Sequence, residues 1–252
     1  MKPQTNMKNI SIVLYKPKYA GNVGSIARAA KNMGIGSIIV VGTTDFDREE
    51  MQQRSTHLAA DVLDKIQYFD NIDTALGDFN YVVGTTSRLG KARGPFIAPR
   101  VIAEKIVNVS RKNKVALLFG PEDTGLFNDE LRYCHAVVSI PTARELKSIN
   151  LSHAVMIVCY EIFTASLASI EEAAPKLALS KELEGMYGQI KTLLAQIRFL
   201  NPENPDYWMK SIRRFFSRVQ LRGRDVQLIR GICRQIDWYC FRKPANAPQE
   251  EK

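Results

Sequence analysis

The chain has 252 residues, of which 45% are hydrophobic and 24% are charged, and its net charge is +9. This composition is ordinary for a globular protein, and the length fits one catalytic domain with a further segment attached. No apolar run reaches the roughly 18 to 20 residues of a membrane span, and the first residues form no apolar signal core. We therefore expect a cytoplasmic protein with no membrane partner.

Most of the chain alternates short apolar runs with stretches of helical periodicity. The predicted strands are Asn9 to Tyr15, Ser37 to Val41, Tyr81 to Gly84, Val115 to Phe119 and Ala136 to Ile140. The predicted helices in this part are Val23 to Met33, Ala98 to Arg111 and Leu151 to Ser169. Apolar strands separated by helices indicate an α/β fold with a mostly parallel sheet that is covered on both faces.

The strand pattern stops near Pro175, and only helical spacing follows it. The predicted helices there are Lys181 to Phe199, Asp206 to Gln220 and Arg224 to Phe241, with a Pro-rich turn at Asn201 to Pro205. The charge changes at the same place, because residues 1–174 carry 20 Lys and Arg against 18 Asp and Glu, whereas residues 175–252 carry 15 against 8. We predict a first domain over residues 1–170, a linker over 171–180, a basic α-helical extension over 181–243 and a polar tail over 244–252.

Two familiar nucleotide-binding signatures are excluded by their spacing. Gly21 to Gly24 lies between a predicted strand and a helix, but its glycines are three apart and do not meet the pattern G-x-G-x-x-G. Gly84 to Lys91 resembles a phosphate loop, yet five residues rather than four separate its glycines, and Ala92 stands where the magnesium-binding Ser or Thr belongs. The cysteines and histidines show no metal-ligand spacing, so we expect no metal site.

Three polar strings begin where apolar runs end. They are Asn22–Arg28, Leu118–Leu126, and the pair formed by Ile140–Thr142 and Ser148–Ser152. In α/β proteins such junctions expose backbone and polar groups to ligands. The order and spacing of the three strings are hard to obtain by chance.

Each residue in these strings has a structural and a functional interpretation. In the structural interpretation, Asn22 is a helix cap and Arg28 a surface charge. In the functional one, Asn22 belongs to a tight turn that exposes N–H groups at a helix N-terminus, and Arg28 projects over a phosphate-rich ligand. Glu122 either caps a helix or supplies a carboxylate at a ligand site. Ser148 and Asn150 precede a strongly apolar helix and can simply cap it.

Taken together, the strings resemble the three motifs of the SpoU family of RNA ribose methyltransferases, with Ile149 where the family commonly has leucine. The basic extension, through Leu183–Tyr187 and Ile212–Phe216, resembles that of the family's TrmJ branch. The resemblance implies a SPOUT-type α/β domain with a C-terminal trefoil knot, S-adenosyl-L-methionine as methyl donor, and a homodimer. It also implies 2′-O-methylation of tRNA, at C or U of nucleotide 32 in the anticodon loop.

The resemblance also implies roles for individual residues. Arg28 receives the activating role, and Asn22, Glu122 and Ser148 are the other catalytic candidates. Because a guanidinium stays protonated in proteins, we interpret Arg28 as a charge that stabilises the developing alkoxide and contacts an RNA phosphate. The implied donor-binding residues are Thr85, Thr86, Ser87, Gly120, Ile140, Lys147, Ser148 and Ile149.

The extension contains a predicted RNA-binding face. Its basic residues recur at three- and four-residue spacing and are Lys210, Arg213, Arg214, Arg218 and Arg222. The predicted opposing apolar surface consists of Trp208, Ile212, Phe215, Phe216 and Val219. Such a face can be merely solvated, but the concentration of charge in this third of the chain favours binding to phosphates.

Two alternatives to a tRNA methyltransferase stay open. The three motifs do not distinguish tRNA from ribosomal RNA as the substrate. The chain could also be a non-catalytic, dimeric RNA-binding protein. The joint presence of Asn22, Arg28, Glu122 and Ser148 argues against this second alternative, because a decayed site would be expected to have lost one of them.

Overall fold

The chain divides into two units, Met1–Ser180 and Lys181–Lys252, and each is described by itself. A computed structural model describes residues 7–43, 46–88, 96–143, 145, 148–168, 175–201 and 203–242. Lys147, residues 171–174 of the predicted linker and the predicted tail lie outside these ranges.

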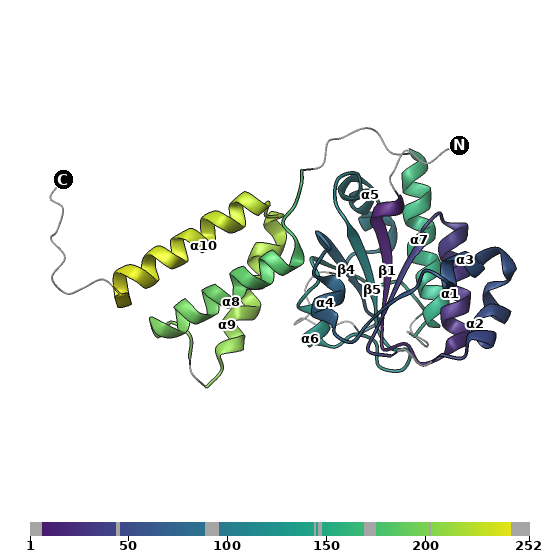
Figure 1. Ribbon diagram of the computed structural model, residues 1–252, viewed down its shortest axis with the longest axis horizontal. Helices are drawn as coiled ribbons and strands as arrows, with labels where there is room; N and C mark the ends of the chain where they lie inside the picture. Colours follow the sequence, from purple (N-terminus) through teal and green to yellow (C-terminus); the bar gives the residue numbers. More distant parts are fainter. Residues whose placement is uncertain are drawn as a thin grey trace. The chain divides into compact units, whose positions relative to one another are not determined.

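A parallel sheet forms the centre of the first unit (Figure 1). It has six strands in the order β3-β2-β1-β5-β4-β6. The strands are β1 (Ile10–Tyr15), β2 (Ser37–Val41), β3 (Gln67–Phe69), β4 (Tyr81–Thr85), β5 (Val115–Phe119) and β6 (Ala136–Val138). The parallel sheet and all five predicted strands are confirmed to within two residues. The sequence did not predict β3, and β6 ends two residues before the predicted Ile140.

Helices cover both faces of this sheet (Figure 1). They are α1 (Ala20–Asn32), α2 (Arg48–Ser55), α3 (Ala60–Leu63), α4 (Ile72–Leu76), α5 (Pro99–Ser110), α6 (Asn128–Leu131) and α7 (Leu151–Ala168), with 3₁₀ turns at Met7–Asn9 and His57–Ala59. Along β1, Ile12 and Leu14 pack with α1, α5 and α7, while Val13 packs on the opposite face with α4. The predicted helices α1, α5 and α7 are confirmed, whereas the shorter helices were not predicted.

Helices α1 and α2 approach each other so closely that only glycine fits where they meet. A Cβ atom on Gly24 would lie 2.1 Å from the backbone carbonyl oxygen of Met51. That distance is far inside the van der Waals separation of the two atoms. Gly24 is therefore required by packing, in addition to any role in the first polar string.

Helix α7 is long and apolar enough to cross a membrane by length and composition alone. In the structure it packs against α1 and α5 and buries Val155, Val158 and Ile162 in the core. Its other side leaves Ile157 37% and Tyr160 53% exposed. The helix is thus a core element of the first unit that keeps a partly uncovered apolar side.

The second unit contains the three predicted helices, here α8 (Ser180–Gln196), α9 (Pro205–Val219) and α10 (Gly223–Asp237), followed by a π-helical turn at Trp238–Arg242. Tyr187 of α8 contacts Phe216 of α9, with ring centroids 6.3 Å apart. Met209 is the buried residue of α9, whereas Trp208 and Phe215 are 45% and 62% exposed. The predicted apolar surface of α9 is therefore wrong in part, since it assigned Trp208, Phe215 and Val219 to the buried side.

Candidate active site

The three polar strings lie at one edge of the sheet. They follow the carboxyl ends of β1, β5 and β6, and the strands β1, β5, β4 and β6 are consecutive neighbours. Thr85, the last residue of β4, and Thr86 and Ser87 in the loop that follows it lie at the same edge. Parallel pairing therefore brings together loops that are more than a hundred residues apart in the sequence.

A chain of side-chain hydrogen bonds joins the three strings directly. The Nδ2 atom of Asn22 donates to Oε1 of Glu122 at 2.8 Å, and the Nδ2 atom of Asn150 donates to Oδ1 of Asn22 at 3.1 Å. We call this set, Glu122, Asn22 and Asn150, the amide relay. It brings together two of the four predicted catalytic residues and adds Asn150, which the sequence indicated only as a helix cap.

Both ends of the amide relay are anchored. Oδ1 of Asn150 accepts hydrogen bonds from the backbone N–H of Ser152 at 2.9 Å and from its Oγ at 2.7 Å, so Asn150 caps α7 as well. At the other end, Oε2 of Glu122 accepts a bond from the backbone N–H of Lys18 at 2.9 Å. All three side chains are thereby held in fixed orientations.

Lys18 and Asp123 form an exposed ion pair beside the amide relay, with Nζ and Oδ2 2.5 Å apart. Their hydrogen bond raises the pKa of Lys18 and lowers the pKa of Asp123. Both side chains are 50% exposed, so the pair adds little to stability. It ties the loop after β1 to the loop after β5 at a second point.

Gly120 has a packing role at the start of the second loop. A Cβ atom there would lie 2.5 Å from the backbone of Gly125 and Leu126. Gly125 has a φ of +57°, a conformation that favours glycine, and its N–H donates to the carbonyl of Pro121 at 2.8 Å. The loop therefore folds back on itself, with a glycine at each of the two positions that need one.

The predicted donor-binding residues after β4 are tied to both neighbouring strands. Oγ1 of Thr85 donates to the carbonyl of Leu118 at 3.2 Å, and the N–H of Thr86 donates to the carbonyl of Val138 at 2.9 Å. Ser87 is exposed. The loops after β4, β5 and β6 thus form one connected edge.

The residues of the third string lie on this edge with mixed exposure. Ile140 and Ile149 are half-buried, whereas Ser148 is exposed and makes no hydrogen bond within the described part of the chain. Half-buried isoleucines near threonine and serine hydroxyls offer both apolar and hydrogen-bonding contacts. This combination fits a ligand that has both apolar and polar groups.

Arg28 lies apart from the amide relay. It is exposed on α1, six residues after Asn22, and forms no ion pair or hydrogen bond with the residues that the structure describes. Six residues correspond to about 1.7 helical turns, so the two side chains leave α1 in different directions. The structure of one chain therefore does not bring Arg28 to Asn22, and its guanidinium is open to a ligand or a second subunit.

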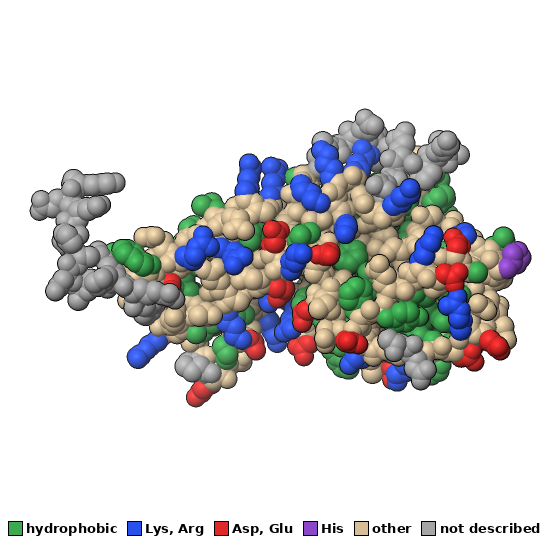
Figure 2. Space-filling model, viewed as in Figure 1, with side chains coloured by type: hydrophobic (Ala, Val, Ile, Leu, Met, Phe, Trp, Pro, Cys, Tyr) green, Lys and Arg blue, Asp and Glu red, His purple; other side chains and the backbone are tan. Residues whose placement is uncertain are grey.

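The predicted RNA-binding residues divide into two groups. Lys210, Arg214 and Arg218 are exposed at four-residue spacing on α9, and Arg222 is exposed at the start of α10. Figure 2 shows Lys and Arg side chains on the visible surface of these helices. Arg213, by contrast, is partly buried and contacts residues of α8.

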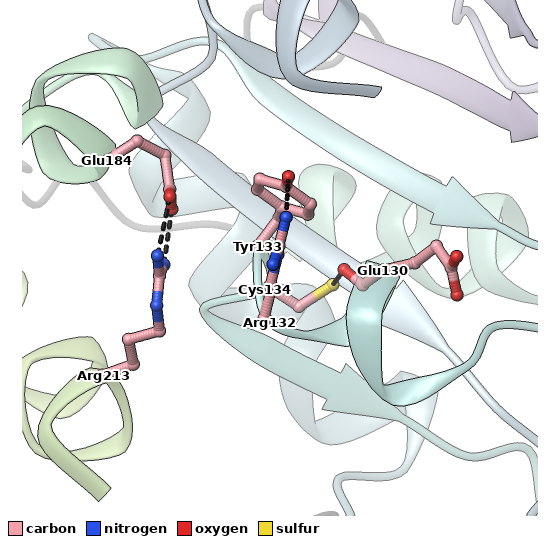
Figure 3. Close-up of polar contacts among 6 residues, drawn as sticks. All are labelled: Glu130, Arg132, Tyr133, Cys134, Glu184 and Arg213. Atoms are coloured by element: carbon pink, nitrogen blue, oxygen red, sulfur yellow. Dashed lines mark hydrogen bonds and ion pairs between the residues drawn. The ribbon is translucent and has the colours of Figure 1, made fainter. Parts of the chain in front are cut away.

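Arg213 is engaged inside the second unit. Its two terminal nitrogens lie 2.6 and 2.7 Å from the carboxylate oxygens of Glu184 (Figure 3). Its guanidinium carbon also lies 4.3 Å from the ring centroid of Tyr187. The side chain joins α9 to α8, which differs from the prediction that it belongs to the RNA-binding face.

Two half-buried titratable groups, Cys134 and His135, directly precede the edge strand β6. Nδ1 of His135 accepts a hydrogen bond from the backbone N–H of Val82 at 3.1 Å, and burial lowers the pKa of His135 to about 4. Sγ of Cys134 lies 3.9 Å from the carbonyl of Glu130 (Figure 3), and burial raises the pKa of Cys134 to about 12. Both residues precede β6, whereas the relay residues follow the carboxyl ends of their strands. Across the described ranges, no three His, Cys, Asp or Glu side chains cluster in a way that could hold a metal ion.

Comparison with known proteins identifies both units. Residues 9–160 match the SpoU rRNA Methylase family, and residues 181–250 match the tRNA methyltransferase TrmJ, C-terminal domain. The tRNA (cytidine/uridine-2′-O-)-methyltransferase TrmJ of Klebsiella pneumoniae is 34% identical over 241 residues, which are 92% of this chain and 97% of that protein.

Solved structures show the same fold. TrmJ from Z. mobilis has a TM-score of 0.78 at 24% identity and covers 90% of this chain and 98% of its own. A methylase family protein from Haemophilus influenzae Rd KW20 has a TM-score of 0.61 at 29% identity, and covers 92% of this chain and 97% of its own.

Proposed function

This chain belongs to the SpoU methylase family, in its TrmJ branch, and from that premise we propose that it transfers a methyl group from S-adenosyl-L-methionine to the ribose 2′-hydroxyl of nucleotide 32, C or U, in the anticodon loop of tRNA. The observation that carries the proposal is the amide relay, because it unites the three motifs in one place. The TrmJ-type second unit favours tRNA over ribosomal RNA.

The reaction requires a poor nucleophile to be aligned and to lose a proton. When bound, S-adenosyl-L-methionine supplies an activated methyl group on its sulfonium. The loops after β4, β5 and β6, with Thr85, Gly120 and Ile149, are the proposed binding edge for it. Arg28 would hold a substrate phosphate and stabilise negative charge as it develops on the ribose oxygen. Asn22 and Glu122 would keep the loops around the reacting groups in place, and exposed Ser148 would contact the substrate.

We further propose a homodimer with the trefoil-knotted topology of the family. The uncovered side of α7, with Ile157 37% and Tyr160 53% exposed, supports a partner on this helix. Arg28 on the neighbouring helix α1 forms no hydrogen bond or ion pair with the described residues of its own chain, which is compatible with a site completed by a second copy.

Donor binding is the first test. Isothermal titration calorimetry of the full chain should detect S-adenosyl-L-methionine, or its demethylated product, without added metal. Absence of binding, with and without tRNA, would favour the non-catalytic alternative.

The nucleotide is tested on unmodified transcripts. The full chain should methylate tRNA at nucleotide 32, and mass spectrometry of nuclease fragments locates the product. Mapping of 2′-O-methyl groups in RNA from cells that lack the gene distinguishes tRNA from ribosomal RNA as the natural substrate. Methylation only of ribosomal RNA would refute the substrate assignment.

The role of Arg28 is tested by substitution. Arg28→Ala should lose most single-turnover methyl transfer while donor binding is retained, because its charge is needed where negative charge develops. Arg28→Lys should also be poor, since an ammonium cannot replace the planar fork of the guanidinium. Near-normal rates in either variant would refute this role.

The basic face is tested by changing Arg214, Arg218 and Arg222 together to Gln. Binding to all RNAs should weaken alike, and the log–log salt dependence should flatten by up to roughly 0.7 to 0.9 for each RNA phosphate that the variant no longer neutralises. An unchanged salt slope would mean that this face is only a solvated surface.

A further inference from the structure

An arginine and an exposed aromatic ring are stacked at the carboxyl edge of the sheet. The guanidinium carbon of Arg88 lies 4.8 Å from the ring centroid of Phe127, within the range of a cation–π interaction. Phe127 is 48% exposed, and Arg88 is exposed as well. Two planar groups are thus presented together to solvent, outside both hydrophobic cores.

The backbone holds both members of this pair. The N–H of Arg88 donates to Oγ1 of Thr86 at 3.2 Å, and Thr86 is itself bonded to β6. The N–H of Phe127 donates to Oε2 of Glu130 at 2.7 Å, which fixes the start of α6. Leu126, the preceding residue, is fully buried and anchors the chain from the other side. The pair is therefore preorganised by its two loops.

The position of the pair ties it to the proposed reaction. Arg88 directly follows Thr85–Ser87, and Phe127 directly follows the loop Gly120–Leu126. Both loops belong to the proposed donor-binding edge. A group that stacks on this pair would lie at the same edge of the sheet as the proposed donor-binding loops.

The chemistry of the pair matches an unpaired nucleotide. Bases splayed out of RNA loops stack on aromatic rings and on guanidinium planes, and an adjacent cation contacts the phosphate. A hydrophobic protein segment would gain less from a site whose ring is flanked by a charged group. The ring and the charge together therefore favour RNA over an apolar peptide as the occupant.

We propose that Arg88 and Phe127 form a stacking site for an unpaired base of the RNA substrate, next to the ribose that is methylated. The inference rests on the proposed RNA methyltransferase function and names two substrate contacts within it. Phe127 provides the ring for the base, and Arg88 extends the stacking surface and contacts the phosphate.

The test uses the full chain with tRNA and with an unmodified anticodon stem-loop. Phe127→Leu should weaken stem-loop binding, measured by fluorescence anisotropy at fixed salt, by about 5- to 100-fold, because base–aromatic stacking has about that effect. Phe127→Tyr keeps an aromatic ring and should bind the stem-loop about as tightly as the unchanged protein. Arg88→Gln should weaken binding and flatten the salt slope, whereas donor binding by calorimetry should not change in any variant.

Tyr68→Leu is the matched control. Tyr68 is 40% exposed on β3, the edge strand at the other end of the sheet from β6. Its replacement removes a similarly exposed ring far from the proposed site in the strand order. RNA binding of this variant should equal that of the unchanged protein.

Stem-loops with one abasic nucleotide identify the base and do not depend on any protein variant. Removal of the base that stacks on Phe127 should weaken binding of the stem-loop to the unchanged protein. The Phe127→Leu variant should bind this abasic stem-loop nearly as well as the unchanged protein does, because the stacking contact is already lost. Equal binding of all abasic stem-loops, or unchanged binding of Phe127→Leu and Arg88→Gln, would overturn the proposal. If the unchanged protein binds the donor and methylates tRNA in that case, the proposed function stands without this site.

Discussion

Arg213 and Arg214 are adjacent in α9, yet the structure predicts opposite effects of changing them. Arg213 makes two charged hydrogen bonds to Glu184, at 2.6 and 2.7 Å, and these side chains are only 20% and 32% exposed. Arg214 is exposed. We expect Arg213→Gln to destabilise the second unit and to change RNA binding little where the unit stays folded. Because Arg214 is exposed, an interaction that it makes within the chain contributes about 0 to 1 kcal/mol. Arg214→Gln should therefore lower stability less than Arg213→Gln does, and it should reduce the salt dependence of RNA binding.

The magnitude follows from the exposure of the ion pair. Exposed pairs contribute about 0 to 1 kcal/mol, whereas breaking a buried pair costs about 3 to 5 kcal/mol. The pair of Arg213 and Glu184 is intermediate and bidentate, so Arg213→Gln should lower the free energy of unfolding by about 2 kcal/mol. In a unit of this size, this corresponds to a fall of roughly 8 to 16 °C in its melting temperature.

Tryptophan fluorescence measures this unit alone. The chain has two tryptophans, Trp208 and Trp238, and both lie in the second unit. Thermal or urea unfolding followed by their emission therefore reports its stability in the full chain. A double-mutant cycle with Glu184→Gln isolates the pair energy. Equal unfolding transitions for Arg213→Gln and Arg214→Gln would refute the reasoning.

Three further outcomes are expected. The pKa of His135 is lowered to about 4 in the folded protein, so the unfolded chain takes up the proton first as the pH falls below about 6.5. The free energy of unfolding should therefore drop by roughly 2 to 3 kcal/mol between pH 6.5 and pH 4. The drop should be smaller in His135→Gln, and urea unfolding at each pH measures both. Gly24→Ala should lower the free energy of unfolding by about 3 kcal/mol, because the added Cβ would lie 2.1 Å from a carbonyl oxygen of α2. Gly36→Ala is the control and should be near neutral in the same assay, because no atom lies within 4 Å of its added Cβ. Exposed Cys240 should be alkylated in the native protein. Cys159 is buried and its pKa is raised to about 12, so it should be alkylated only after unfolding; mass spectrometry distinguishes the two.

The sequence predicts those elements of the fold that bury a continuous apolar surface. The central strands β1 and β5 are buried almost throughout, so their composition identifies them. Strand β3, Gln67–Phe69, is three residues long and largely exposed at the edge of the sheet, so it has no apolar run. Helix α2 buries Met51 and Ser55 only, and its packing against α1 depends on the small size of Gly24 rather than on an apolar face.

The sequence predicts which polar residues belong to the site, but not which of them are in contact, because the contacts depend on the order of the strands in the sheet. The sequence identifies Asn22 as a polar residue at a helix start and Glu122 as one in a loop, but their hydrogen bond depends on β1 and β5 being neighbours. Asn150 was interpreted as a helix cap, and that interpretation is right for its Oδ1 atom, while its Nδ2 atom serves the relay. Arg213 has the spacing of a surface charge, and its engagement by Glu184 depends on how α8 and α9 pack.

The amide relay has a direction. Its hydrogens are all donated the same way, from the N–H of Ser152 to Asn150, from Asn150 to Asn22, and from Asn22 to Glu122. Rotating either amide group by half a turn would set two acceptors or two donors against each other, so each asparagine fixes the orientation of the next. Aspartate at position 22 would remove the donor that Glu122 requires and place two carboxylates together. A ligand that displaces any one of these three loops must therefore disturb the other two, and the edge of the sheet responds to binding as a single part.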